Sequence, residues 1–280
     1  MKKTFDIIKR FFPRAALLYD AEAIFSMREV LKARVRGDER MERVAEGMMN
    51  QELHLVKKAD LIITVSENER KVIAEKTGLK NVKVWGHPVE VKEPQTPFNQ
   101  RKDILFVGGF PSLDSPNEDA IVYFAKEVFP KVEPELSCRL FIVGMNPPNS
   151  VRKLSSSSVI VTGYVEDLRE YYEKCRIFVV PHRYSAGIPW KLHETMSHGI
   201  PSVVSKLTAQ LDLTDGKEVL VADTSEEFAK KVINLYQDEK LWHTVQHHAL
   251  NLIRETCAPE TMKDALNKII LQGLQTKGGD

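Results

Sequence analysis

The segment that follows the apolar run Ile177–Val180 carries the residue types best suited to binding an anion. Gly187 permits a close backbone approach, and Pro189 suits the first turn of a helix, where free N–H groups and the positive dipole end attract phosphate. Lys191 adds a positive charge in that turn, and Glu194 follows on the same face, where its carboxylate accepts hydrogen bonds from ligand hydroxyls. The same spacing also describes a solvated i,i+3 ion pair, so both interpretations stand.

Two further groups of candidate residues follow predicted strands. Arg183 comes just after the strand that ends near Val180, as a second cation for an anionic ligand or as the partner of a surface acid. Gly108 and Gly109 either let a phosphate approach the backbone or form a plain tight turn. They do not complete the G-x-G-x-x-G fingerprint, because Phe110 stands in the third position, which counts against a dehydrogenase.

Other chemical signals in the sequence favour structural interpretations. His193, Glu194 and His198 resemble H-E-x-x-H, but the five-residue spacing turns the imidazoles about 140° apart around a helix, so we predict no metal site. Ser66 is interpreted as a helix cap, because no G-x-S-x-G elbow surrounds it. The cysteines form no C-x-x-C pair, which predicts a reducing compartment and neither a disulfide framework nor a zinc cage. They are Cys138, Cys175 and Cys257.

These candidates must be positioned by the alternation of short apolar runs with amphipathic stretches from Arg101 onward. The runs are Ile104–Val107, Leu140–Val143, Val159–Val161, Ile177–Val180, Ser202–Val204 and Leu220–Ala222. Strand, helix and strand in succession predict an α/β fold with a parallel, doubly wound, Rossmann-like sheet. Such a sheet binds nucleotides beyond the carboxyl ends of its strands, where each candidate falls.

The first hundred residues predict a different organisation. Only two convincing strands, Ala16–Tyr19 and Leu61–Val65, occur there, which is too few for a complete doubly wound domain. The polar stretch Glu90–Pro97 contains two prolines and is interpreted as a linker. We therefore predict a partial N-terminal domain and linker over residues 1–97, and a complete C-terminal domain with closing helices over residues 98–280.

Composition excludes several classes of protein. The 280 residues carry 40 Lys and Arg against 39 Asp and Glu, a net charge of +1, which argues against a nucleic-acid partner. No run approaches the ~18 apolar residues of a membrane span, and charges interrupt the N-terminal segment, so we predict neither a span nor a signal peptide and expect a cytoplasmic protein. The N-terminal segment is interpreted as an ordinary helix or a truncation edge, with peripheral contact to an anionic membrane as the alternative. Its basic and apolar residues are Lys2, Lys3, Lys9, Arg10, Phe5, Ile8, Phe11 and Phe12.

Several segments together carry a family resemblance. They are Tyr19–Phe25 with Arg28-Glu29, Ala59-Asp60 with Val65–Arg70, Leu105–Gly109 with Ser115–Asn117, Gly163–Val165 with Asp167-Leu168, and Ala186–Pro189 with Lys191, His193-Glu194 and Gly199–Pro201. This set resembles the group 1 (family four) glycosyltransferases of the two-domain GT-B fold. The likeness covers about residues 15–265.

The resemblance implies a glycosyltransferase that moves a sugar from a nucleotide-diphosphate-sugar donor to an acceptor hydroxyl in polysaccharide or glycan biosynthesis. It implies retention of the anomeric configuration and no obligatory metal or other cofactor, with Lys191, Arg183 and Glu194 as the catalytic residues. The turn at Tyr164 would contact the base, although an ordinary aromatic residue is the alternative. The implied donor-binding residues are Gly108, Gly109, Gly163, Tyr164, Val165, Ala186, Gly187, Ile188, Lys191 and Glu194.

The chain departs from the family pattern at two places. Many members carry two glutamates eight residues apart, and here the second corresponds to Glu194 whereas the first is Ala186. Complete members also begin with a glycine-rich loop and strands that bind the acceptor, and these are missing upstream of Tyr19. An incomplete donor-binding subunit that needs a partner chain, and a nucleotide-sugar epimerase of the same fold, are therefore the alternatives.

The acceptor is expected to be a glycan or a lipid-linked sugar. Glu22, Arg28 and Glu29 match a family motif and are candidates for the cleft without an assigned role. His87 is either a hinge or acceptor-side residue or a structural histidine.

Overall fold

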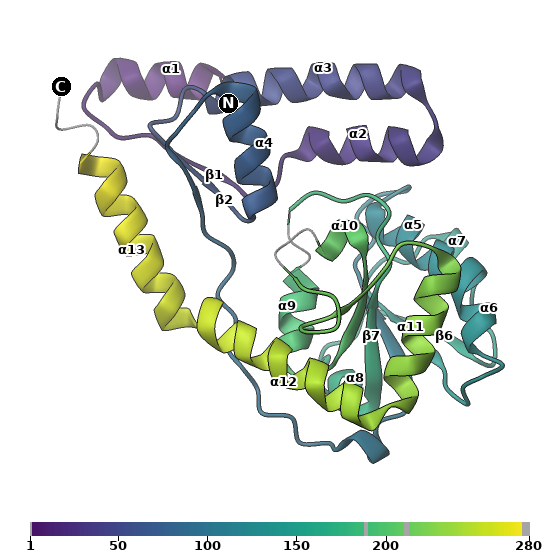
Figure 1. Cartoon of the computed structure of the whole chain (residues 1–280). Helices are drawn as coiled ribbons and strands as arrows, with labels where there is room; N and C mark the ends of the chain where they lie inside the picture. The colour runs from purple at the N-terminus through teal and green to yellow at the C-terminus, as the bar shows by residue number, and fades with distance from the viewer. Residues whose placement is uncertain (1, 188–189, 210–212, 276–280) are drawn as a thin grey trace. The chain divides into compact units, whose positions relative to one another are not determined.

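The computed structural model describes residues 2–187, 190–209 and 213–275. The chain divides into two compact units, and Figure 1 labels most of their helices and several of their strands. Unit 1 contains the chain as far as Pro88, the short segment Tyr184–Gly187 and the C-terminal segment from Pro259. Unit 2 contains the intervening chain, from Val89 to Ala258.

The division differs from the predicted one at the linker. Residues 89–97 pack on unit 2, because the Val89 N–H donates to the Cys257 carbonyl (2.7 Å) and the Lys92 N–H donates to the Ser197 carbonyl (2.8 Å). The final helix packs instead on unit 1, where the Trp85 indole donates to the Met262 carbonyl at 2.8 Å. These hydrogen bonds join segments that are distant in the sequence. The boundary between the two units therefore does not follow the order of the chain.

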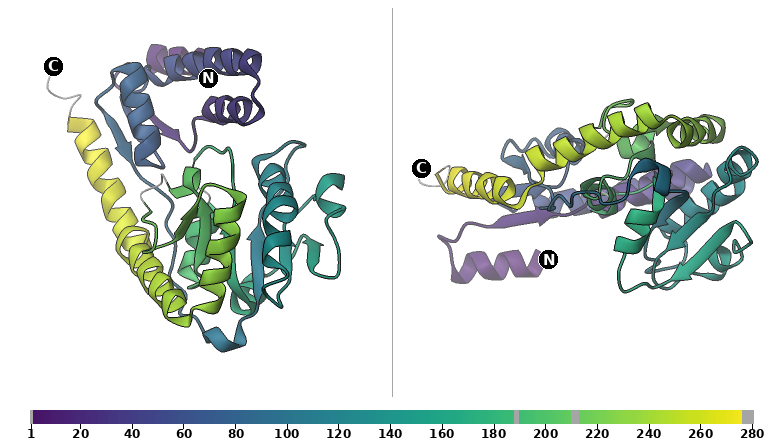
Figure 2. Two further views of the ribbon diagram at one scale, coloured as in Figure 1. Left: turned by 45° about the vertical axis from the view of Figure 1, so that its right-hand side comes forward. Right: turned by 90° about the horizontal axis from the view of Figure 1, so that it is seen from below.

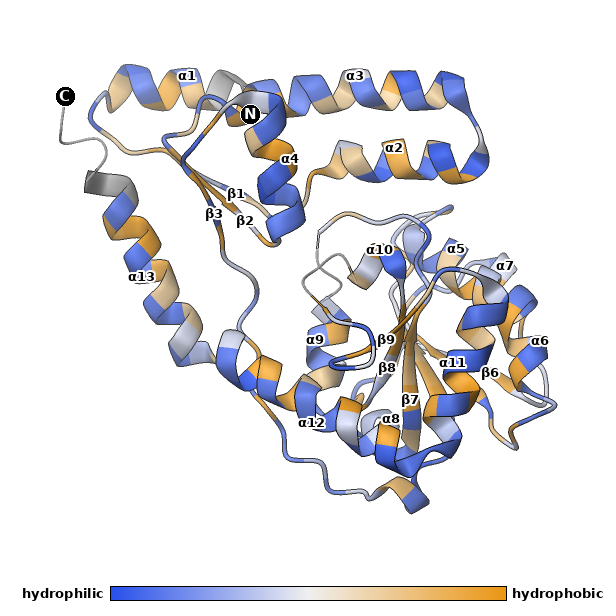
Figure 3. Cartoon of the chain, in the orientation of Figure 1, coloured by the Kyte–Doolittle hydropathy of each residue, from blue (hydrophilic) through white to orange (hydrophobic). Residues whose placement is uncertain are grey.

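Unit 2 is built on a six-stranded parallel sheet in the order β6-β5-β4-β7-β8-β9. The strands are β4 (Asp103–Val107), β5 (Leu140–Val143), β6 (Val159–Gly163), β7 (Cys175–Val180), β8 (Ser202–Ser205) and β9 (Leu220–Ala222). All six predicted strands are confirmed, with ends that shift by at most two residues. Figure 3 shows them as predominantly hydrophobic segments, as expected for strands buried on both faces.

Helices cover both faces of this sheet (Figure 2). One apolar cluster joins α5 (Pro116–Tyr123), the π-helical segment η2 (Phe124–Val128), α6 (Phe129–Val132), α7 (Asn149–Arg152) and α11 (Ser225–Gln237) to one face. A second cluster joins α8 (Arg169–Lys174) and α9 (Trp190–Ser197) to the other face, and α12 (Glu239–Thr256) contributes to both. The short elements η1 (Phe98–Gln100) and α10 (Lys206–Ala209) complete the unit. The predicted doubly wound fold is confirmed.

Unit 1 contains a three-stranded parallel sheet in the order β1-β2-β3. Its elements are β1 (Leu18–Ala21), β2 (Leu61–Thr64), β3 (Val82–Val84), α1 (Lys2–Phe11), α2 (Phe25–Arg36), α3 (Glu39–Val56), α4 (Glu67–Thr77) and α13 (Pro259–Gln275). The third strand was not predicted, because three residues are too short to give a periodic signal. The predicted cap is confirmed: Ser66 Oγ accepts from the Glu69 N–H at 3.2 Å. None of the described helices is long and apolar enough to cross a membrane.

Candidate functional site

Three glycine turns meet where β4, β5 and β6 end. The Gly108 N–H donates to the Val143 carbonyl, and the Gly144 N–H donates to the Gly163 carbonyl, both at 2.9 Å. A Cβ at position 144 would lie 2.0 Å from the Gly108 carbonyl oxygen, so only glycine fits there. The carboxyl edge of the sheet therefore presents closely packed backbone, as a phosphate-binding edge requires.

Asn117 connects this edge to the neighbouring helices. It lies in the first turn of α5, which Ser115 caps by accepting from the Glu118 N–H at 3.3 Å. The Asn117 side-chain amide donates to the Gly109 carbonyl at 2.6 Å. Its oxygen accepts from the Lys191 ammonium and lies 2.9 Å from His182 Nε2.

Lys191 makes no ion pair with an acidic side chain among the described residues. Its Nζ donates to Asn117 and lies 5.2 Å from the centroid of the Phe106 ring, which is fully buried. Desolvation lowers the Lys191 pKa to about 7. A poorly solvated ammonium group without a counterion gains stability when an anion binds beside it, so Lys191 is a candidate for anion binding.

His182 supports Asn117 from the end of β7. Its ring is buried and stacks on Phe106 with centroids 6.3 Å apart. Because the Asn117 amide nitrogen already donates to Gly109, the amide oxygen accepts the His182 Nε2 proton, which assigns the tautomer. Burial, followed by the nearby Lys191 charge, lowers the His182 pKa well below its usual value, so the ring is neutral.

The structure brings together three of the residues singled out in the sequence and adds two. A Cβ on Gly108 would lie 2.8 Å from Asn117 Cγ and 3.1 Å from Lys191 Nζ, so Gly108 and Gly109 share one cluster with Lys191. Asn117 belonged to a family-like segment but was not assigned to the site. His182 gave no sequence signal beyond its place after a buried strand.

Glu194 and Lys191 point to different partners. Lys191 and Glu194 make no ion pair in the described structure, and Glu194 instead raises the pKa of the buried Tyr172 hydroxyl, after the larger effect of burial. Arg183 pairs with Asp119 through two hydrogen bonds of 2.9 and 2.5 Å. Arg183 is therefore in an ion pair, whereas its role as a second cation for an anionic ligand stays a prediction.

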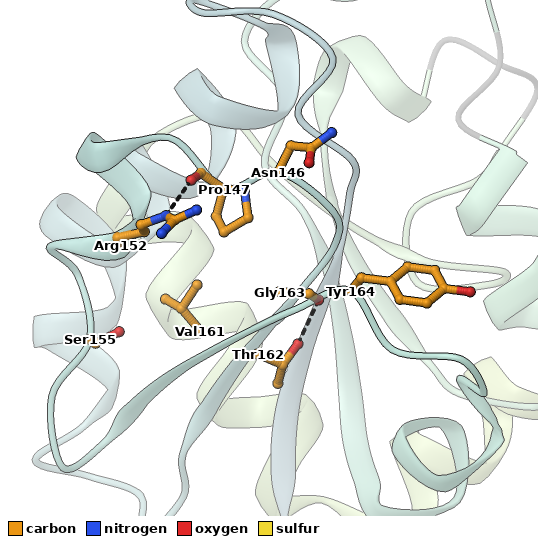
Figure 4. A pocket seen from close by; sticks show the side chains of 8 residues that line it. All are labelled: Asn146, Pro147, Arg152, Ser155, Val161, Thr162, Gly163 and Tyr164. Atoms are coloured by element: carbon orange, nitrogen blue, oxygen red, sulfur yellow. Dashed lines mark hydrogen bonds between the residues drawn. The ribbon is translucent and has the colours of Figure 1, made fainter.

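A pocket of about 440 Å³ opens beside the end of β6 (Figure 4). Gly163 and Tyr164 line it, and Tyr164 is 68% exposed. Val165, the next residue, packs against the apolar cluster on the α8 and α9 face. Tyr164 is therefore an exposed aromatic residue rather than a core residue, and Figure 4 shows its ring directed away from the other labelled residues of the pocket.

Ala186 and Gly187 belong to unit 1 and are described with it. The Gly187 N–H donates to Glu69 Oε1 at 3.1 Å, and the same oxygen accepts from the Ile24 N–H at 2.9 Å. Gly187 has a φ of +72°, and a Cβ there would lie 2.7 Å from the Glu22 carbonyl oxygen. Ile188, another predicted donor-binding residue, lies outside the described residues.

The remaining N-terminal candidates lie in unit 1. Arg28 and Glu29 are neighbours in an ion pair of 3.2 Å and line a pocket of about 380 Å³ between α2 and α3. His87 perturbs Asp20, whose pKa is raised by burial and by Glu22 and lowered by His87. In the described part of the chain, no group of three His, Cys, Asp or Glu side chains is placed to hold a metal ion.

Comparisons with known proteins place this geometry in context. Residues 101–238 match the family model described as glycosyl transferases group 1. Curated protein sequences give no match to the chain.

The fold is similar to several solved structures. They include sucrose-phosphate synthase from Thermosynechococcus elongatus (TM-score 0.71, 14% identity, 96% of this chain and 71% of that one) and HepE from Anabaena in complex with UDP and glucose (0.68, 15%, 96% and 76%). TarM is also similar (0.66, 16%, 80% and 45%), so the chain spans less than half the length of TarM. The α/β fold of the chain is therefore of the GT-B type.

Proposed function

We propose that the chain is a retaining glycosyltransferase of group 1, family four, which moves a sugar from a nucleoside diphosphate to an acceptor hydroxyl. The observation that carries the proposal is Lys191, a poorly solvated lysine without an acidic partner in the described structure. It lies at the carboxyl edge of a parallel sheet, inside the segment that matches the glycosyltransferase model. This is the position where such sheets bind nucleotides.

The proposed chemistry needs a positive charge on the departing diphosphate. When the bond between sugar and phosphate breaks, negative charge develops on the phosphate oxygen, and the Lys191 ammonium stabilises it. The attraction between the ammonium and the phosphate oxygen is stronger at this poorly solvated position, because the effective dielectric constant there is lower than in bulk solvent. In this proposal the lysine supplies the charge that a metal ion supplies in other transferases.

Two further residues complete the proposed donor site. Glu194 accepts hydrogen bonds from the ribose hydroxyls, and it is half-buried on α9. Tyr164 stacks against the base beside the end of β6, for which its exposed ring is suited. The HepE complexes with UDP and with UDP-glucose make a uridine nucleotide the first donor to test.

We further propose an acceptor in a cell-surface glycan or lipid-linked sugar, a cytoplasmic location and, through the exposed Phe11 and Phe12 rings of the N-terminal segment, peripheral contact with the membrane. These assignments extend the family resemblance to the whole reaction.

Calorimetry of the purified chain against UDP, UDP-glucose and the corresponding guanosine, adenosine and thymidine nucleotides tests the proposal. We expect one nucleotide series to bind and Lys191→Met to weaken that binding at least tenfold, since hydrogen bonds to charged groups contribute about 1.5–3 kcal/mol. Lys230→Met, at an exposed position on α11, is the matched control. Absence of nucleotide binding, or equal binding by both variants, would contradict the donor site.

Product analysis separates the proposed activity from its alternatives. Conversion of the donor sugar without any acceptor indicates an epimerase, whereas transfer that depends on an added acceptor indicates a transferase. Donor binding without turnover indicates a donor-binding subunit that works with a partner chain.

A further inference from the structure

We propose that Asn117 is a positioning residue that sets the charge specificity of the donor site: its neutral amide holds the Lys191 ammonium beside Gly109 without cancelling the positive charge. The inference rests on the proposed function, because the ligand it concerns is the donor diphosphate. It assigns to Asn117 a role that the family resemblance does not supply.

The hydrogen bonds fix the orientation of the Asn117 amide. The amide oxygen receives two donors, from Lys191 and His182, and the amide nitrogen donates to the Gly109 carbonyl. The reversed amide would place its N–H groups against those two donors and its oxygen against a carbonyl. The hydrogen bonds to Lys191 and Gly109 would both be lost, so one orientation is selected and the ammonium is held in place.

The charged side chains near Lys191 interact with groups other than the Lys191 ammonium. Glu118 and Asp119, which follow Asn117 on α5, accept from the Asp114 N–H and from Arg183. On α9, the negative charge of Glu194 raises the pKa of the Tyr172 hydroxyl, after the larger effect of burial, and His193 lies beside the Cys257 thiol. His182 is neutral, and the β4 side contributes the Phe106 ring.

An amide and a carboxylate at position 117 therefore have opposite consequences. The amide positions the ammonium and leaves one net positive charge for an incoming anion. A carboxylate of the same shape would form an ion pair with Lys191, hold the lysine pKa higher and compete with the phosphate oxygens for it. A neutral anchor thus favours a multiply charged diphosphate over ligands without phosphate.

The test compares Asn117→Asp with Asn117→Ser and with Asn234→Asp, an isosteric control at an exposed position on α11. Calorimetry measures the dissociation constants of UDP and of uridine between pH 6.5 and pH 9. For Asn117→Asp at neutral pH we expect UDP binding to weaken about tenfold or more and uridine binding to stay within about twofold, since only the diphosphate meets the added charge. The fall of UDP affinity at alkaline pH should move to higher pH.

Asn117→Ser removes the anchor without adding charge. We expect a smaller loss of UDP affinity, with the alkaline fall at the wild-type pH. Equal losses in Asn117→Asp and Asn117→Ser, with an unmoved pH profile in both, would show a purely structural role and overturn the inference. Unchanged UDP binding in Asn117→Asp would also overturn it, whereas a wild-type chain that binds no nucleoside diphosphate would instead overturn the proposed function.

Discussion

The Lys191 ammonium donates its hydrogen bond to the amide oxygen of Asn117, a residue 74 positions earlier in the chain. The pair joins α9, beyond β7, to α5, beyond β4, and these two strands are neighbours in the sheet. It places a cation at the carboxyl edge of the sheet, and Lys191 has no acidic partner within the part of the chain that the structure describes. The charge is therefore available to a ligand, and the predictions for this site concern its consequences.

The first prediction concerns the pH dependence of donor binding. Because the Lys191 pKa lies at about 7 without ligand and a bound diphosphate raises it, binding takes up a proton above that pH. We expect the dissociation constant of UDP to rise by up to about tenfold per pH unit above pH 7. Calorimetry in buffers of different ionisation enthalpy measures the proton uptake. In Lys191→Met the uptake should disappear, and a wild-type affinity independent of pH between 7 and 9 would contradict the prediction.

The second prediction concerns the close contact at Gly108. In Gly108→Ala the new Cβ would lie 2.8 Å from Asn117 Cγ and 3.1 Å from Lys191 Nζ, so the anchored pair must shift. We expect UDP affinity to fall about tenfold, because displacement of a charged group by about 1 Å costs as much or more. Gly47→Ala, where the Cβ meets nothing within 4 Å, is the control and should leave binding unchanged. Wild-type affinity in Gly108→Ala would show that the loop is free to move.

The third prediction concerns the buried carboxyl group of Glu69. Burial raises its pKa more strongly than the N–H groups of Ile24 and Gly187 lower it. When folding raises the pKa of a carboxyl group, the free energy of unfolding falls as the pH increases from the unfolded pKa of that group, about 4.3, through its folded pKa. We therefore expect Glu69→Gln to raise the thermal midpoint of unfolding at pH 7, with the gain shrinking toward pH 4.

Circular dichroism at several pH values measures the Glu69→Gln effect. Glu75→Gln, an exposed substitution on the same helix, is the matched control and should leave the midpoint nearly unchanged at every pH. A lower midpoint for Glu69→Gln at pH 7 would show that the ionised carboxylate stabilises the fold.

The fourth prediction concerns the buried guanidinium of Arg101. Its side chain is fully buried, donates to the carbonyls of Thr96, Tyr172 and Cys175, and reaches Glu173 at 3.3 Å. Arg101→Met leaves these acceptors without their donor, and we expect a loss of about 3–5 kcal/mol in the free energy of unfolding.

Urea unfolding, monitored by tryptophan fluorescence, measures the loss. The Trp242 ring reports on this site because the Arg101 guanidinium lies over it. Arg254→Met removes an exposed ion pair with Glu93 and should cost less than about 1 kcal/mol. Similar losses in the two variants would contradict the role assigned to burial.

The sequence determined the architecture of the larger unit because its signals are local. Each buried strand, such as Leu140–Val143, is a continuous apolar run of the right length, and the alternation with helices leaves few arrangements other than a parallel sheet. The helix start at Ser66 was equally local, since the cap bonds to a residue three positions away. The same reasoning placed Lys191 and the Gly108–Gly109 turn at the carboxyl edge of the sheet.

Only the tertiary structure decided which partners these residues have. Lys191 has Glu194 within one helical turn, yet the ammonium bonds to Asn117, because crossover connections bring the ends of β4 and β7 together. Arg183 in the same way is matched with Asp119, and His182 becomes neutral by burial that no spacing reveals. Sequence spacing fixes contacts along one helix or strand, whereas charge, tautomer and pKa depend on neighbours that are distant in the chain and are set by packing.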